Sequence, residues 1–239
     1  MLQVEFAENL RLAELEDAAA QFRVACAFQY GLGTTKNETK ATMWFERSSF
    51  QGYEAAQGVC SIYGVGVTKN ENAGFKLLRL SAQSRLPEVQ FLLGKCYSGF
   101  NPQEAVKWLR LAADQGHAGA QSNLGVCNQN GAGVSQDAKK AVKWYRLAAA
   151  QGYAHAQCDL GVCYENGTGV PQDAKEAVKW YRLGVWRLSK GTRMRSVILA
   201  LVMQVEGALL RIFGKPLGGI SWLLVKGSHP HSSTLLLVT

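Results

Sequence analysis

Residues 118–153 read AGAQSNLGVCNQNGAGVSQDAKKAVKWYRLAAAQGY, and residues 154–185 repeat this segment without a gap as AHAQCDLGVCYENGTGVPQDAKEAVKWYRLGV. A segment that recurs at a fixed period predicts a repeat architecture, in which each unit is one supersecondary motif stacked on the next. The repetition breaks off at Gly184, where unrelated sequence replaces the alanine-rich end of the first copy. The fold is therefore decided by the repeated unit and by the place where it stops.

Each unit has the pattern of a helix, a glycine-rich loop and a second helix. Apolar residues recur at i, i+4 and i+7 in the first segment and at i, i+3, i+4 and i+7 in the second, which is the spacing of one helix face. In residues 118–153 these positions are Ala120, Leu124 and Cys127, then Ala141, Trp144, Tyr145 and Ala148. Asp137 is predicted to cap the second helix, and Asp173 with Glu176 to form a capping box in the next copy. A two-helix unit of this size cannot bury its apolar face alone, so the units are expected to stack.

Looser copies of the same frame precede these two. We divide the chain into a lead-in helix (1–17), a repeat array (18–185, in units 18–53, 54–86, 87–117, 118–153 and 154–185) and a non-repeat segment (186–239). The second unit has about one helical turn less than the others, because Gln57 runs directly into GVCSIYG. The third unit keeps both helices and lacks five loop residues.

The pattern AxAQxxLGxxYxxGxGVxxDxxKAxxWYxxAAxQG resembles that of Sel1-like repeats, which are relatives of the tetratricopeptide repeat. The resemblance implies an all-α fold, a right-handed α-solenoid of about five two-helix repeats. It also implies an intracellular, non-catalytic adaptor or scaffold that binds a protein or peptide, without naming the partner, since a fold alone does not give a function.

Charge is distributed unevenly along the chain. The formal charge of +8 divides into 19 Lys and Arg against 17 Asp and Glu in residues 1–185, and 7 against 1 in residues 186–239. Most of the basicity therefore lies outside the repeats. Nucleic acid is not expected as a partner, because the repeat array has a small net charge and no aromatic residues interleave with its basic ones.

Six cysteines are expected to remain thiols in the cytoplasm, where we place the chain because its N-terminus lacks the pattern of a secretory signal. Cys60, Cys96, Cys127 and Cys163 recur at one place in successive repeats, which predicts a small apolar packing position in each. We expect no metal and no cofactor. His117 and His155 fall at turns between repeats, where an exposed side chain is the ordinary expectation.

One branch of the resemblance offers an enzymatic alternative. Secreted cysteine-rich Sel1-like proteins with β-lactamase or penicillin-binding activity carry two cysteines per repeat, which bridge the helices of a unit. The second helices of this chain contain no cysteine. We therefore expect no enzymatic activity.

If the first helices line the inner face, as in tetratricopeptide arrays, the inward positions lie two residues before the Leu of each LG pair and two, five and six after it. They are predicted to form a polar, amide-rich groove with two aromatic anchors, suited to an extended peptide. The alternative is that Phe22 and Phe91 only pack on neighbouring helices. The predicted positions are Phe22, Gln29, Phe91, Lys95, Ser122, Val126, Gln129, Asn130, Cys158, Val162, Glu165 and Asn166.

Basic residues recur on the second helices and predict a positively charged outer ridge. Stacking would align them into two ladders, Lys107/Lys143/Lys179 and Arg110/Arg146/Arg182. Rungs about 10 Å apart are separated by about one Debye length at physiological salt, so they repel each other weakly. Such a stripe is either a solvated face or a surface for an acidic protein or phosphoinositide.

Residues 186–239 contain no further copy of the repeat. Their apolar runs are shorter than the roughly 18 residues that a membrane-spanning helix needs. Three interpretations remain open: a cap on the last repeat formed by residues 197–213, a membrane-surface element with Arg187, Lys190, Arg193 and Arg195, or a stretch with no evolved fold. The sequence does not indicate the oligomeric state.

Overall fold

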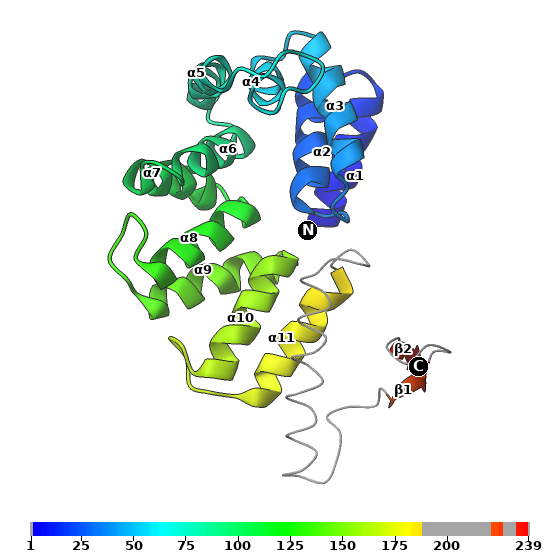
Figure 1. Cartoon of the computed structure of the whole chain (residues 1–239), viewed down its shortest axis with the longest axis vertical. Coiled ribbons are helices and arrows are strands. Elements are labelled where there is room, and N and C mark those ends of the chain that lie inside the picture. Colours follow the sequence, from blue (N-terminus) through cyan, green and yellow to red (C-terminus); the bar gives the residue numbers. More distant parts are fainter. Residues whose placement is uncertain (1, 188–220, 227–232, 239) are drawn as a thin grey trace.

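The computed structural model describes residues 2–187, 221–226 and 233–238. The helices in this part of the chain form five successive antiparallel pairs preceded by a single helix (Figure 1). The elements are α1 (Leu2–Glu14), α2 (Ala18–Tyr30), α3 (Glu38–Phe50), α4 (Glu54–Tyr63), α5 (Glu71–Ser81), a 3₁₀ turn (Ala82–Ser84), α6 (Pro87–Tyr97), α7 (Pro102–Asp114), α8 (Ala118–Asn130), α9 (Ala138–Ala150), α10 (Ala154–Asn166), α11 (Ala174–Arg187), β1 (Ser221–Lys226) and β2 (Ser233–Val238).

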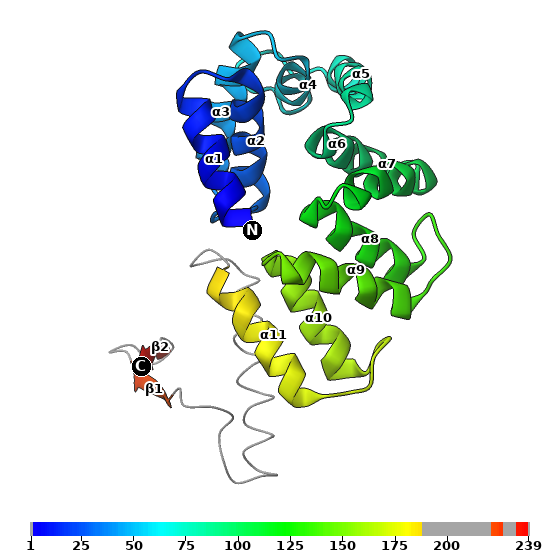
Figure 2. The same cartoon turned by 180° about the vertical axis from the view of Figure 1, so that it is seen from behind.

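The repeat array is an α-solenoid, as predicted, and it curves strongly. Successive pairs pack on each other through α3 and α4, α7 and α8, and α9 and α10. The path bends so far that α1 and α2 lie opposite α8 to α10 across the concave side (Figures 1 and 2). Leu2 and Leu32, near the start of the chain, pack against the core cluster of α9 and α10.

The side chains of the repeat pattern pack as their spacing predicts. Ala120 and Leu124 on α8 are fully buried, and so are Ala141, Tyr145 and Ala148 on α9, whereas Trp144 and Cys127 are half-buried. Because each apolar face is covered partly by the next pair, the buried apolar side chains form successive clusters along the array.

The two second helices for which a side-chain cap was predicted, α9 and α11, begin with it. Asp137 Oδ1 accepts from the backbone N–H of Lys140 at 2.9 Å, and Asp173 Oδ1 accepts from that of Glu176 at 3.1 Å. The reciprocal half of the predicted capping box is absent, because the N–H of Asp173 donates to the carbonyl of Tyr164 and the Glu176 carboxylate pairs with Lys179. Asp173 therefore acts as a simple N-cap.

The repeat glutamines tie each repeat to the preceding one. The side-chain amides of Gln21, Gln121 and Gln157 donate to the carbonyls of Ala13, Ala113 and Ala149, each eight residues upstream, at 3.1–3.2 Å. A glutamine in the turn then donates to the oxygen of the repeat glutamine, as in the pairs Gln51–Gln21, Gln115–Gln90 and Gln151–Gln121 at 2.8–2.9 Å. The AxAQ and AAxQG parts of the pattern thus form one polar network, in which the repeat glutamines are buried and the turn glutamines are more exposed.

Helix α1 takes the position of a second helix of a preceding repeat. A Cβ atom added to Gly133 would lie 2.2 Å from the carbonyl oxygen of Pro102, and one on Gly33 would lie 2.1 Å from that of Leu2. Both glycines are 31 residues after the residue they approach, so Leu2 on α1 corresponds to Pro102 on α7. Only glycine leaves room for the loop to pass this close to the preceding helix.

The second and third repeats depart from the pattern as the sequence predicts. Helix α4 has 10 residues, against 13 in α2, α8 and α10. Across this shortened repeat, Tyr30 of the first repeat contacts Phe91 of the third, with ring centroids 4.9 Å apart. The short α4 therefore accompanies a direct contact between repeats that are not neighbours in sequence.

Strands β1 and β2 pair in antiparallel register, with Ser221 opposite Val238 and Lys226 opposite Ser233. The sequence did not predict this pair. The cap proposed at 197–213 and the basic residues Lys190, Arg193 and Arg195 lie outside the described residues. No helix in the described ranges is long and apolar enough to cross a bilayer.

Candidate functional site on the concave face

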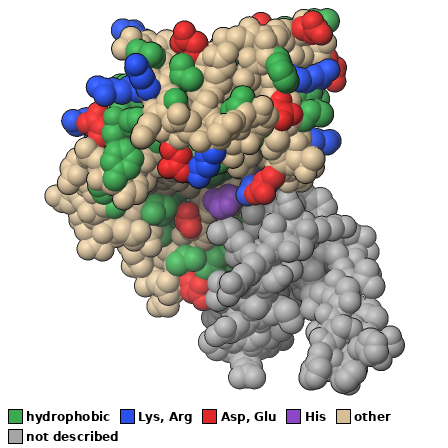
Figure 3. All heavy atoms as spheres, turned by 45° about the horizontal axis from the view of Figure 1, so that its top comes forward, with side chains coloured by type: hydrophobic (Ala, Val, Ile, Leu, Met, Phe, Trp, Pro, Cys, Tyr) green, Lys and Arg blue, Asp and Glu red, His purple; other side chains and the backbone are tan. Residues whose placement is uncertain are grey.

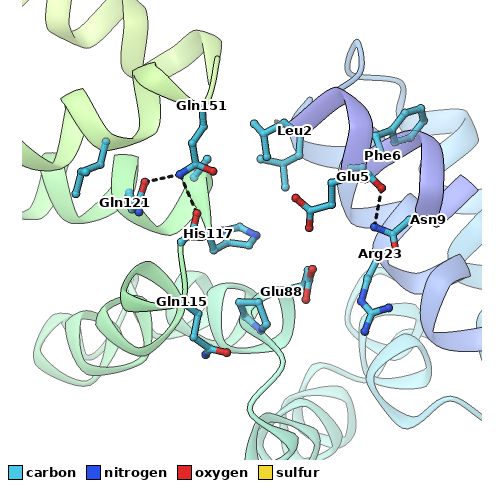
Figure 4. Close-up of a pocket in the computed structure, with 16 residues that line it drawn as sticks. Leu2, Glu5, Phe6, Asn9, Arg23, Glu88, Gln115, His117, Gln121 and Gln151 are labelled. Carbon is cyan, nitrogen blue, oxygen red and sulfur yellow. Dashed lines mark hydrogen bonds between the residues drawn. The ribbon is translucent and has the colours of Figure 1, made fainter.

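A pocket of about 400 Å³ opens on the concave side, where the start of the chain faces the middle of the array. Its walls come from α1 and α2 on one side and from the start of α6, the turn between α7 and α8, and the end of α9 on the other (Figure 4). Side chains of both charges and a histidine gather at the centre of this side of the molecule (Figure 3). The pocket therefore joins residues more than a hundred positions apart in the sequence.

His117 is the N-cap of α8 and forms part of the pocket wall. Its Nδ1 accepts from the backbone N–H of Ala120 at 3.1 Å, and its ring lies 4.6 Å from that of Phe91, centroid to centroid. Burial lowers the pKa of His117 to about 4, so the ring is neutral at physiological pH. Since Nδ1 is an acceptor, the proton of the neutral ring is on Nε2, which has no hydrogen-bond partner among the described residues.

Two carboxylates point into the same space as the His117 ring (Figure 4). Glu88, in the first turn of α6, has a buried Oε2 with no hydrogen-bond partner among the described residues. Burial raises the pKa of Glu88, the nearby Glu5 carboxylate on α1 adds to this shift, and Arg23 on α2 opposes it. The site therefore presents two acidic groups and one basic group on a largely apolar wall.

An aromatic and cationic surface lies beside the pocket. Lys95 Nζ is 4.4 Å from the centre of the Tyr30 ring and 5.8 Å from that of Phe91. Burial lowers the pKa of His155, and the charges of Lys36 and Lys95 add to this shift. The ring contacts thus join side chains of the first and third repeats, and His155 of the fifth repeat lies near enough to be affected by the charge of Lys95.

The predicted groove is wrong for four of its residues. Phe22, Phe91, Ser122 and Cys158 are each less than 5% exposed, so they cannot line an open surface. Phe22 packs against Phe45 and Tyr53, and the Cys158 sulfur faces Gly184. Phe22 and Cys158 thus pack on the second helix of their own repeat, and Phe91 packs on Tyr30 of the first repeat and on His117 at the start of α8, which is the packing alternative that the sequence left open.

The remaining predicted positions are accessible to different degrees. Gln129 and Glu165 are half-buried, and each accepts a hydrogen bond from a tyrosine of its own repeat: Tyr145 at 2.8 Å and Tyr181 at 2.5 Å. Gln29 and Val162 are also half-buried, whereas Lys95, Val126, Asn130 and Asn166 are exposed. Of all these residues, Lys95 lies beside the pocket through its contact with Tyr30 and Phe91, and the binding role of the exposed set remains a prediction.

Several residues of the two predicted basic ladders already interact with neighbouring side chains of this chain. Lys107 pairs with Glu104 at 2.9 Å, Lys179 pairs with Glu176 at 3.1 Å, and Arg146 donates to the Tyr164 hydroxyl at 2.9 Å. Arg182 is half-buried. Arg110 and Lys143 instead line a second hollow of about 570 Å³ together with Lys140 and Trp144.

Sequence reasoning missed the residues that form the concave pocket. His117 was expected to be exposed, but it is buried because it caps α8 and stacks on Phe91. Gln121 and Gln151 line one wall of the pocket. Both recur in the repeat pattern, so their recurrence was a sequence signal for this wall. No signal pointed to Glu5 or Arg23, because only the curvature of the array brings α1 and α2 opposite α8.

The six cysteines of the chain are all free thiols, and burial raises the pKa of Cys127 and that of Cys163, the latter to about 11. A raised pKa disfavours the reactive thiolate. No cluster of three or more His, Cys, Asp or Glu side chains that could hold a metal ion occurs in the described ranges.

Comparison with known proteins identifies the repeats. A family model described as Sel1 repeat matches residues 18–53, 53–85, 87–117, 118–153 and 154–184. The structure is similar to a Sel1 repeat protein of Oxalobacter formigenes (TM-score 0.55, 28% identity, 82% of this chain and 80% of the other). It is also similar to a protective antigen of uropathogenic Escherichia coli with an SLR fold (TM-score 0.54, 28% identity, 95% of this chain and 53% of the other).

Among curated proteins, the DAP3-binding cell death enhancer 1 of Rattus norvegicus is 34% identical over 49% of this chain and 32% of its own length. The mouse protein of the same name is 32% identical over the same shares. The chain therefore spans less than a third of the length of these relatives.

Proposed function

The chain belongs to the Sel1 repeat family, and from this premise we propose that it is a non-catalytic adaptor that holds an extended protein segment on the concave face of its repeat array. The observation that carries the proposal is the closed curvature, which places α1 and α2 opposite α8 and so encloses a pocket beside Tyr30 and Lys95, two side chains that contact the buried Phe91 ring. A concave surface with apolar anchors and a few polar groups suits an extended segment.

Two further observations favour binding by a protein adaptor over catalysis. One relative is named for binding a protein, which supports a protein partner for this chain. His117 uses one ring nitrogen to cap α8, and the thiols of Cys127 and Cys163 have raised pKa values, so these side chains are poorly suited to act as base or nucleophile. The free thiols also suit the reducing cytoplasm, where we place the protein.

Selection of peptides on the full chain tests the proposal. A phage-displayed library of random peptides is expected to yield binders with micromolar dissociation constants, about −8 kcal/mol. Their binding should weaken about tenfold or more in Tyr30→Ala and Lys95→Glu, because the aromatic contact and the cation are lost from the concave face. Lys107→Glu, an exposed residue of α7 that lines neither hollow, is the control and should leave binding unchanged. Binders that ignore the first two variants would contradict the proposal.

A second candidate surface is the hollow lined by Arg110, Lys140, Lys143 and Trp144. Its three cations and one aromatic ring suit an acidic segment of a protein. In the same selection, binders rich in Asp and Glu that are lost in Lys143→Glu and kept in Lys95→Glu would place the interaction here. Their affinity should also fall as salt is raised.

A further inference from the structure

The concave pocket contains two buried polar atoms whose hydrogen-bonding capacity is unused within the described residues. They are Oε2 of Glu88, which is an acceptor, and Nε2 of His117, which is a donor because Nδ1 accepts from Ala120. A buried polar atom without a partner costs about 1–3 kcal/mol. The two atoms come from different helices and point into one space, so an occupant could satisfy both (Figure 4).

The charges around the pocket indicate what the occupant carries. Glu5 and Glu88 contribute two negative charges when ionised, and Arg23 contributes one positive charge, so the acidic groups are in excess. A positively charged group placed between the carboxylates would offset this excess and donate to Glu88. An acidic group would meet repulsion from both carboxylates and would leave Glu88 without a donor.

The rest of the wall suits an aliphatic stem. Leu2, Phe6, Leu32 and Leu147 line the pocket around the charged groups. Lysine and arginine side chains carry three or four methylene groups that pack on apolar surface while the charged end finds a carboxylate. The volume of about 400 Å³ is large enough for such a side chain together with part of its backbone.

We propose that this pocket is a specificity site for a lysine or arginine side chain of the bound segment, with its cation at Glu88 and Glu5 and a backbone carbonyl of the segment at Nε2 of His117. The inference rests on the proposed function, since it names the residue type that the concave face selects. It excludes an acidic or purely apolar anchor at this position.

The test compares peptide selections on the full wild-type chain with selections on Glu88→Lys. The wild type should enrich peptides with Lys or Arg at one fixed position, and Glu88→Lys should lose that enrichment because its own cation replaces the carboxylate. For one selected peptide, replacing the basic residue by norleucine should weaken binding to the wild type about ten- to a hundredfold, the effect of losing a charged hydrogen bond.

The same replacement should have a smaller effect on the Glu88→Gln variant, which lacks one of the two carboxylates, and less than about a threefold effect on the double variant Glu5→Gln with Glu88→Gln, which lacks both. Gln keeps the shape of Glu, and Glu5→Gln provides a second variant should Glu88→Gln fail to fold. Glu104→Gln, which removes a carboxylate on the exposed face of α7, is the matched control and should behave as the wild type.

Peptides that bind the concave face with no preferred basic residue would overturn the inference and leave the proposed function standing. Peptides that require an acidic residue there would overturn it as well. If the full chain selects no peptide, or only peptides that ignore Tyr30→Ala and Lys95→Glu, both the inference and the proposed function fail.

Discussion

The side-chain amide of Gln151 donates to the side-chain oxygen of Gln121 at 2.8 Å, and the amide of Gln121 in turn donates to the carbonyl of Ala113 at 3.2 Å. This pair connects three consecutive helices through one buried side chain. In the last repeat, Gln157 makes the equivalent bond to Ala149 at 3.1 Å, while its oxygen has no hydrogen-bond partner among the described residues. The residue that corresponds to Gln151 is Arg187, so the broken repeat has lost the glutamine donor.

Replacing the two repeat glutamines should therefore have unequal effects. Gln121→Ala removes one buried and one partly buried hydrogen bond, while the Ala113 carbonyl and the Gln151 amide each keep a partner in Gly116, so it should lower the free energy of unfolding by about 2 kcal/mol. Gln157→Ala removes one bond together with an oxygen that had no partner, and should cost about 1 kcal/mol. Urea unfolding followed by circular dichroism measures both, and equal losses would contradict the network.

Gly184 and Cys158 pack against each other in the last repeat, where the glycine leaves room for the cysteine sulfur. A Cβ atom added at Gly184 would lie 2.5 Å from the Cys158 sulfur, whereas the preceding repeat has Ala148 and the smaller Ser122 at these positions. Gly184→Ala should destabilise the chain by about 1–3 kcal/mol through overpacking. The double variant Cys158→Ser with Gly184→Ala recreates the preceding repeat and should recover most of the loss. A double-mutant cycle in urea gives the coupling, and purely additive effects would reject the pairing.

Asp159 should make the array less stable as pH rises. Burial raises the pKa of Asp159 in the folded chain to about 6, while an unfolded aspartate titrates near about 3.9. The folded state therefore binds the proton more tightly, and stability is lost as pH rises between these two values. Asp159→Asn, which copies Asn123 of the preceding repeat, should stabilise the chain by about 1–3 kcal/mol at neutral pH and by almost nothing below about pH 4. A gain that does not depend on pH would contradict this.

His117 should have the opposite dependence on pH. Burial lowers its pKa to about 4 in the folded chain, against about 6.5 when unfolded. Its neutral form is favoured by folding, so its contribution is fully present above the unfolded value and is lost as pH falls from about 6.5 to 4, by up to about 3 kcal/mol. His117→Asn keeps a capping side chain for Ala120 and removes the titration. The difference between wild type and variant in unfolding free energy should change across this range, and a constant difference would show that His117 does not titrate there.

Arg85 occupies a turn position that favours glycine. Its φ is +62°, while Gly116 at the corresponding turn of the next repeat has φ +92° and open space around its Cβ position. Arg85→Gly should stabilise the chain by up to about 1 kcal/mol, and Gly116→Ala should destabilise it by about the same amount, because only the left-handed backbone distinguishes the two residue types here. Thermal unfolding of the two variants measures both shifts, and shifts of the same sign would contradict the assignment.

The local structure of the repeats could be predicted well from the sequence. Asp137 caps α9, Ala141 and Tyr145 form its buried face, and Gln57 marks the shortened α4, because each of these features depends on residues within one helix or one turn. The capping box at Asp173 was only half right. Its reciprocal bond was lost to Tyr164, a residue on the preceding helix that competes for the same N–H.

The candidate site could be predicted only in part. Phe22 and Phe91 were placed on an open groove by analogy with tetratricopeptide arrays, and both are buried in the packing between helices. His117 was expected in solvent, whereas it is buried beside Phe91. Which side of a helix becomes the concave surface depends on how each pair rotates on the next, and that rotation is a property of packed side chains from two repeats.

The sequence by itself determined the family of the fold, the number of repeats and the place where the pattern ends, because these follow from the spacing of apolar, glycine and capping residues over short distances. Only the tertiary structure decided that Glu5 and Arg23 face Glu88 and His117. That arrangement results from the accumulated curvature of several helix pairs, including the short α4, and accumulated rotation between packed units leaves no periodic signal in the sequence.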